Sequence, residues 1–112
     1  MSTDPSADPG SQPVTGADEP PATKYVMTYE GVEGFLPLAQ EHGAGHAARL
    51  REFHARGLVL MAGPLLEPFD GDAMAIFTSR EAAEEFIAGD PFVLGGVVAR
   101  WRLRPWSEGL AP

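Results

Sequence analysis

Four short segments of the chain carry the hydrophobic pattern of β-strands. They are residues 24–30, 58–61, 73–78 and 97–106. The first is rich in β-branched and aromatic side chains, the next two are short apolar runs, and the last alternates between apolar and polar residues. These patterns are typical of strands that are buried on one or both faces.

Two segments are predicted to be helices. Residues 45–56 place side chains on one helical face at the spacing i, i+4, i+7 and i+8, and these are His46, Leu50, Phe53 and His54. A second helix is expected over residues 80–88, with Ser79 as its N-cap. Gly57 and Gly89 follow the two segments and are natural helix ends.

The predicted order of elements is β-α-β-β-α-β. Two split βαβ units with right-handed crossovers give an antiparallel sheet with both helices on one face, which is the ferredoxin-like α+β fold. Several of the alternate strand residues that would point to the opposite face are apolar, and an apolar face favours a partner. A homodimer with the two sheets face to face is the simplest arrangement.

A change of composition near residue 23 indicates a tail followed by one domain. Residues 1–23 contain five prolines and four acidic residues but almost no large apolar side chain. Such a segment cannot bury enough surface to offset the entropy lost on ordering, so we predict that it is disordered. Residues 24–112 then form the folded domain.

The charge distribution does not favour a nucleic-acid partner. The net charge is −8, and the eight basic residues do not form a run. Arg100, Arg102 and Arg104 share one face of the last predicted strand. They could form an anion-binding stripe, but exposed charge on an edge strand also protects against aggregation. We favour the second interpretation and expect neither nucleic acid nor a membrane as a partner.

The chain contains no cysteine, which excludes disulfides and thiolate-bound zinc. Its apolar runs are too short to span a bilayer, and the N-terminal residues lack the basic and apolar regions of a secretory signal. A cytoplasmic location is therefore expected.

His46 is the first candidate for chemistry. It lies on the same helical stripe as Leu50 and Phe53, so its side chain is expected to face the sheet. It could be a hydrogen-bonded core histidine or a general acid/base. In the second case, its position at the start of the predicted helix would keep the imidazole neutral and able to accept a proton near pH 7.

Asp90 is the second candidate. It could simply cap a short turn that begins with Pro91. The predicted topology offers another role, because the two helices run antiparallel and the start of the first lies near the end of the second. A carboxylate there could hydrogen-bond His46, set its tautomer and stabilise the cation formed on proton uptake.

Metal and cofactor sites are not predicted. His42 and His46 have the i, i+4 spacing of metal ligands, but the predicted helix begins after Gly43 and no H-E-x-x-H motif is present. The chain also lacks a phosphate-binding glycine loop and the G-x-S-x-G motif of esterases.

Several segments together resemble the YCII-related family. H-A-A-R-L at residues 46–50 with G-L-V-L-M-A-G-P at 57–64 is similar to the family's H-x-x-x-L and G-x-L-x-x-A-G-P core. E-A-A at 81–83 and D-P-F-V at 90–93, followed by the G-V pair at 96–97, resemble its other motifs. Their order and spacing extend the resemblance over residues 24–107.

The resemblance implies a dimeric α+β barrel and a pocket with a catalytic His and Asp, which carry over to His46 and Asp90. The family includes a dechlorinase of a chlorinated hydroxyquinol. We therefore expect a cofactor-independent acid/base enzyme of the isomerase or dehalogenase type, acting on a cyclic or phenolic molecule. Tyr25, Met61 and Phe92 are candidate apolar pocket walls. The alternative is a non-catalytic dimer that binds a small ligand or a protein.

Overall fold

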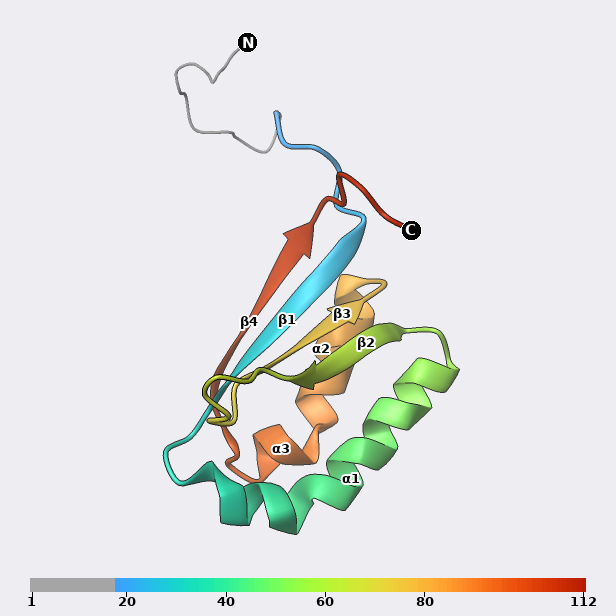
Figure 1. Ribbon diagram of the computed structural model, residues 1–112. Coiled ribbons are helices and arrows are strands. Elements are labelled where there is room, and N and C mark those ends of the chain that lie inside the picture. The colour runs from blue at the N-terminus through green and yellow to red at the C-terminus, as the bar shows by residue number, and fades with distance from the viewer. Residues whose placement is uncertain (1–17) are drawn as a thin grey trace.

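The computed structural model describes residues 18–112, which form a four-stranded antiparallel sheet with helices on one face (Figure 1). The elements along the chain are β1 (Lys24–Gly31), α1 (Phe35–Ala55), β2 (Val59–Pro64), β3 (Ala73–Phe77), α2 (Arg80–Gly89), α3 (Pro91–Leu94) and β4 (Val98–Trp106). Within the sheet the order is β2-β3-β1-β4. The predicted ferredoxin-like α+β fold is confirmed. Most of the tail predicted over residues 1–23 lies outside the described residues.

The first helix is longer than predicted. α1 begins at Phe35 and continues without a break through Gly43 and Gly45 to Ala55. An interior glycine disfavours a helix by about 1 kcal/mol, which is why the sequence pattern places the start after the two glycines. In a helix of 21 residues, packing against the rest of the fold offsets this cost.

The earlier start of α1 also changes the expected surroundings of His46. The residue lies in the middle of α1, so the prediction that a helix N-terminus keeps its imidazole neutral is wrong. His42 lies one turn before His46 on the same helix, and the prediction that His42 precedes the helix is wrong as well.

The second half of the domain follows its prediction more closely. The hydroxyl of Ser79 accepts the N–H of Ala82 at 3.1 Å, as expected for the N-cap of α2. β2 extends to Pro64, beyond the predicted end at residue 61. The segment predicted as a turn after α2 contains the short helix α3, which begins at Pro91.

The register of the strands defines the two faces of the sheet. Met27 of β1 pairs with Ala75 of β3 and with Leu103 of β4, and residues directly opposite one another point to the same side. Met27 and Ala75 are buried, so this is the inner face. The rest of the buried core cluster is Tyr29, Phe53, Val59, Phe77, Ala82, Ala83, Phe86 and Ile87.

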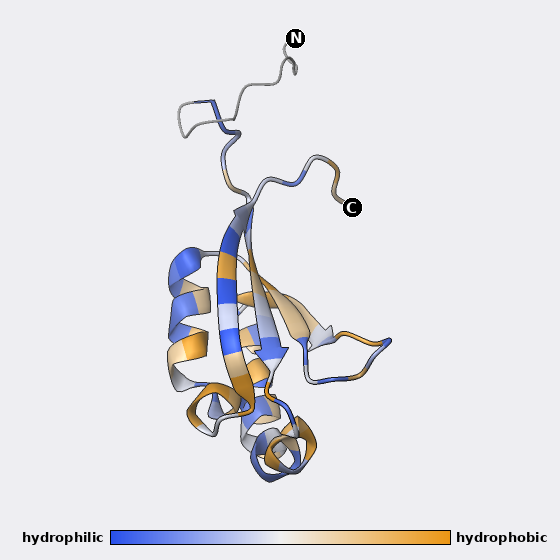
Figure 2. Ribbon diagram, turned by 90° about the vertical axis from the view of Figure 1, so that its left-hand side faces the viewer, coloured by the Kyte–Doolittle hydropathy of each residue, from blue (hydrophilic) through white to orange (hydrophobic). Residues whose placement is uncertain are grey.

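The outer face carries the other residue of each strand pair. Val26, Met74 and Ile76 lie there together with the arginines of β4. Figure 2 shows the alternation of hydrophilic and hydrophobic residues along β4, which is an edge strand. Arg100 donates to the carboxylate of Glu30 on β1 at 2.7 Å.

Among residues 18–112, the structure contains no helix with the length and apolar character that a membrane span requires.

Replacing Gly43 by alanine tests the extended helix. Gly43→Ala should raise the free energy of unfolding by about 0.5–1 kcal/mol, because alanine favours the helix interior. A Cβ built there meets no atom within 4 Å beyond the local helix backbone. Urea denaturation measures the change, and a destabilised Gly43→Ala variant would contradict a helix that includes this residue.

The matched comparison is Gly31→Ala at the end of β1. A Cβ at Gly31 would lie 2.5 Å from the Cα of Gly71 and 2.6 Å from the carbonyl oxygen of Asp70. Because both contacts are with backbone, the loop must move, and we expect a loss of more than about 1 kcal/mol of unfolding free energy in the same assay.

Candidate functional site

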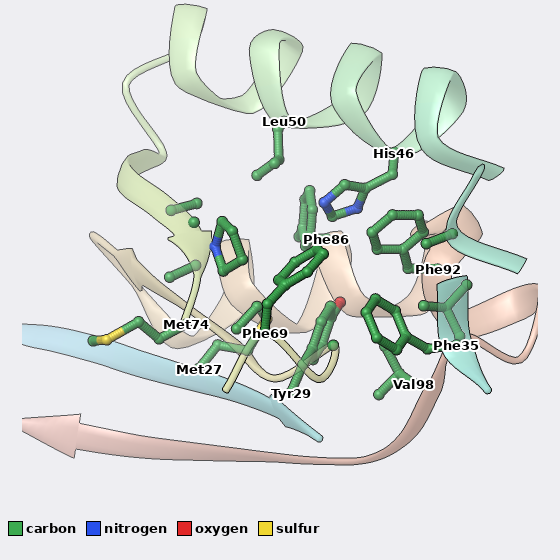
Figure 3. Close-up of a pocket in the computed structure, with 18 residues that line it drawn as sticks. Met27, Tyr29, Phe35, His46, Leu50, Phe69, Met74, Phe86, Phe92 and Val98 are labelled. Carbon is green, nitrogen blue, oxygen red and sulfur yellow. The ribbon is translucent and has the colours of Figure 1, made fainter. Parts of the chain in front are cut away.

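A cavity of about 380 Å³ lies between α1 and the inner face of the sheet (Figure 3). Aromatic rings form part of its walls. Phe35 and Phe69 meet edge to face with their ring centroids 5.3 Å apart, and Phe86 and Phe92 also line the cavity. Apart from His46 and Tyr29, the side chains that line the cavity are all apolar. The polar chemistry of the cavity is therefore concentrated in two residues.

His46 is bound to a buried carboxylate. Its Nδ1 lies 2.8 Å from Oδ1 of Asp90. The Asp90 side chain has no solvent exposure, whereas 18% of the His46 side chain is exposed. The hydrogen bond thus connects a fully buried acid to a ring at the edge of a cavity.

Two further donors complete the surroundings of Asp90. The hydroxyl of Tyr29 donates to Oδ2 at 2.7 Å, and the backbone N–H of Phe92 donates to Oδ1 at 3.1 Å. The second bond makes Asp90 the N-cap of α3, while its own backbone N–H closes α2 by donating to the carbonyl of Ile87 at 3.4 Å. The N-cap role that the sequence suggested is therefore present together with the contact to His46.

The hydrogen bonds determine which protons the site holds. Burial first, and then the hydrogen bond to Asp90, raise the pKa of the Tyr29 hydroxyl far above its ordinary value of 10.0, so the phenol stays protonated. Both oxygens of Asp90 accept hydrogen bonds from other groups, Oδ2 from Tyr29 and Oδ1 from the backbone of Phe92. An acceptor oxygen beside Nδ1 favours the tautomer of His46 that has its hydrogen on Nδ1. Nε2 makes no hydrogen bond to the described residues and remains free for a ligand.

Phe92 packs directly on the imidazole. The rings of Phe92 and His46 are stacked with centroids 3.8 Å apart and an angle of 6° between their planes. The ring of Phe86 meets His46 edge to face at 6.2 Å. One short segment, Asp90-Pro91-Phe92, thus supplies both the hydrogen-bond partner and one flat wall of the histidine.

Two glycines allow α1 to approach this segment closely. A Cβ added at Gly45 of α1 would lie 3.1 Å from Cγ of Pro91. A Cβ added at Gly95 would overlap the ring of His42. The close approach of α1 to α3 brings His46 within hydrogen-bonding distance of Asp90. Gly45, which helps to obscure the helix in the sequence, therefore also permits this contact.

The expected pocket walls are only partly where the sequence placed them. Phe92 lines the cavity, whereas Tyr25 and Met61 are not among its lining residues. Met61 follows an irregularity in the pairing of β2 with β3, lies opposite Ile76, and is 68% exposed. Tyr25 is on the inner face, but the guanidinium of Arg80 lies over its ring, 5.2 Å from the centroid.

Sequence reasoning missed Tyr29 and the aromatic residues Phe35, Phe69 and Phe86. One signal for Tyr29 was available, because it shares the inner face of β1 with Met27. That position also fits an ordinary core tyrosine, and only the contact with Asp90 distinguishes the two.

A metal site is not apparent in the described part of the chain. Residues 18–112 contain no group of three or more His, Asp or Glu side chains placed to hold an ion. His42 and His46 share a helical face, but Nδ1 of His46 is already bound to Asp90.

Comparison with known proteins identifies the type of domain. The family model of the YCII-related domain matches residues 23–107. The comparison with curated proteins gave no match. Among solved structures, the chain is similar to the 5-chloro-2-hydroxyhydroquinone dehydrochlorinase of Burkholderia phenoliruptrix, solved in complex with 2,5-dihydroxybenzoquinone. The identity is 21%, the match covers 77% of this chain and 95% of that chain, and the TM-score is 0.67. At this identity the likeness shows the fold alone.

The raised pKa of Tyr29 gives a testable dependence on pH. Tyr25→Phe leaves Tyr29 as the single tyrosine of the chain. In this variant we expect no phenolate absorbance above pH 10.0 until the protein unfolds, because the folded state keeps the buried phenol protonated.

The same shift affects stability. The folded pKa of Tyr29 exceeds the unfolded value, so its contribution is complete below pH 10.0 and decreases as the pH rises above it. Urea denaturation across this range should show a steeper loss of stability in Tyr25→Phe than in the variant that also carries Tyr29→Phe. Phenolate absorbance from folded Tyr25→Phe protein would contradict this assignment.

Proposed function

The chain belongs to the YCII-related domain family, and from this premise we propose that it is an enzyme that moves a proton on a cyclic or phenolic small molecule. The reaction would be of the isomerase or dehalogenase type. His46 is the general acid/base, and Asp90 orients it and stabilises its cation. The observation that supports this proposal is the 2.8 Å hydrogen bond between a histidine at the wall of an apolar cavity and the fully buried Asp90.

The cavity suits a single-ring ligand. Its volume of about 380 Å³ lies at the lower end of the usual range of about 300–1,000 Å³ for small-molecule sites. The rings of Phe35, Phe69 and Phe92 would contact the flat sides or edges of such a ring. The structurally similar dehydrochlorinase acts on a chlorinated hydroxyhydroquinone, and its structure contains a dihydroxybenzoquinone. Hydroxylated single rings are therefore the class of substrate that we propose.

The proposed reaction begins with transfer of a proton from a ring hydroxyl to Nε2 of His46. The O–H bond breaks, the N–H bond forms, and the electron pair stays on the substrate as an enolate. Return of the proton to a ring carbon gives the keto tautomer, which completes an isomerisation. If that carbon carries chlorine, chloride then leaves with the bonding pair and a second hydroxyl loses its proton. The ring becomes a quinone, one HCl is released in total, and no external oxidant is required.

Asp90 makes this transfer easier through charge. When His46 takes up a proton, the imidazolium forms next to a carboxylate that is shielded from solvent, where the attraction between opposite charges is stronger than in water. Positioned proton transfer of this kind typically contributes about 10²–10⁴-fold to a rate.

Replacing His46 tests the proposed role. We expect His46→Gln to lower kcat at least about 10²-fold on any substrate found in a panel of chlorinated hydroquinones, hydroxyquinols and lactones, because glutamine cannot accept the proton. His54→Gln is the matched control, since His54 lies on the same helix but is exposed and outside the cavity lining. Folded His46→Gln protein with unchanged turnover would rule out His46 as the base.

A non-catalytic binding module is the second candidate. The apolar lining of the cavity favours it, because an apolar cavity can bind a ring compound without a base. This alternative predicts that ring compounds raise the melting temperature equally in the parent and in His46→Gln, with no turnover of any panel member. A cytoplasmic location and the absence of nucleic-acid and membrane partners remain predictions from the sequence.

We also propose that the chain forms a homodimer through the outer face of its sheet. Val26, Met74 and Ile76 give this face an apolar centre, and Trp106 is 43% exposed beside them. An exposed apolar sheet face is more stable when it is covered. Two copies related by a two-fold axis would each cover the other.

A charge placed on this face should break the dimer. Thr28 is exposed on the outer face and pairs with Arg102. We expect Thr28→Arg to give a monomer, because two copies would bring added positive charge together. Gln40→Arg on the exposed side of α1 is the matched control and should remain dimeric. Sedimentation equilibrium measures the mass, and a monomeric parent would contradict the dimer.

A further inference from the structure

The two oxygens of Asp90 have different partners. Oδ1 is shared by His46 Nδ1 and the backbone N–H of Phe92, whereas Oδ2 receives the hydroxyl of Tyr29. Among the described residues, no other donor to Oδ2 is present. Since the Asp90 side chain has no solvent exposure, water cannot replace the phenol without a rearrangement.

We infer that Tyr29 is a positioning residue that fixes the Asp90 carboxylate, and through it the tautomer and orientation of His46. The phenol holds Oδ2, so the carboxylate cannot rotate about its Cβ–Cγ bond without losing a buried hydrogen bond. With Oδ2 held, Oδ1 stays in line with Nδ1 of His46. The histidine is then held in its Nδ1–H form, and Nε2 remains unprotonated at the cavity wall.

The position of Tyr29 in the fold suits this role. It lies on β1 between β3 and β4, in the centre of the sheet, and its side chain is 3% exposed. A central strand moves less than a loop, so the phenol is a fixed reference for a carboxylate located where α2 ends and α3 begins. The middle of α1 supplies no helix dipole to His46, but the Tyr29–Asp90 pair supplies a defined acceptor for its Nδ1.

The inference rests on the proposed function in one respect only, which is that Nε2 accepts the proton of the substrate. The tautomer itself is a property of the protein without substrate. Failure of the inference and failure of the proposed function can therefore be distinguished, because the first is read from His46 without a ligand and the second from turnover of the ring-compound panel.

The test is the nitrogen NMR spectrum of His46 in ¹⁵N-histidine-labelled protein above neutral pH, assigned with His42→Gln and His54→Gln. We expect the parent to show the Nδ1–H form. Tyr29→Phe should produce a mixture with a substantial Nε2–H population, and should lower kcat on an identified substrate about tenfold with a smaller change in KM. Tyr25→Phe is the matched control, because it also removes one phenol from the inner face of β1 and should leave the His46 signals unchanged.

A second measurement applies if Tyr29→Phe does not fold. Incorporating 3-fluorotyrosine into the Tyr25→Phe variant modifies Tyr29 alone and makes its hydroxyl a stronger donor. A stronger bond to Oδ2 should draw charge from Oδ1 and move the Nδ1–H proton signal of His46 upfield. An Nε2–H form in the parent, or a His46 spectrum that responds to neither change at Tyr29, would overturn the inference.

Discussion

The buried carboxylate of Asp90 is the constraint on which the rest of the arrangement depends. A charged group without solvent exposure is tolerated only where hydrogen bonds replace its lost hydration. Here the donors come from three elements: Tyr29 on β1, His46 on α1, and the backbone N–H of Phe92 on α3. Displacing any of these elements would leave the carboxylate partly unpaired in the core. The need to satisfy one acid therefore fixes the sheet, the long helix and the short helix relative to one another, and it holds the imidazole at the cavity wall.

Local patterns predicted the fold well because each strand has a clear apolar signal and the element order leaves few topologies. They placed the start of α1 wrongly because Gly43 and Gly45 have low helix propensity, and the contacts that compensate for them come from residues distant in sequence. The prediction that Met61 lines the pocket was wrong for a similar reason, because it used only the local sequence pattern. An irregularity in the pairing of β2 with β3 changes the direction of the strand's side chains, and such a shift has no local signature in an apolar run.

For the candidate site, the order and direction of the predicted elements were more informative than the local sequence pattern. The antiparallel arrangement of α1 and α2 predicts that His46 and Asp90 are neighbours, and this holds although the helix start used to argue it was misplaced. Tyr29 could not be recognised in the same way. A tyrosine at an inward position of a central strand usually only fills the core, and its hydroxyl acquires a role here because the end of α2 lies across from it.

The cavity has two parts that can vary separately. The polar corner depends on Asp90, and a change there would disturb three elements of the core. Another part of the lining is Phe35 in the first turn of α1 and Phe69 in the loop between β2 and β3, which contact one another. Substitutions at these two phenylalanines would alter the shape of the cavity without disturbing the hydrogen bond between His46 and Asp90. A shared fold at 21% identity is therefore compatible with a different ligand. The choice of a ring ligand would depend on the apolar space lined by Phe35 and Phe69, more than on the histidine.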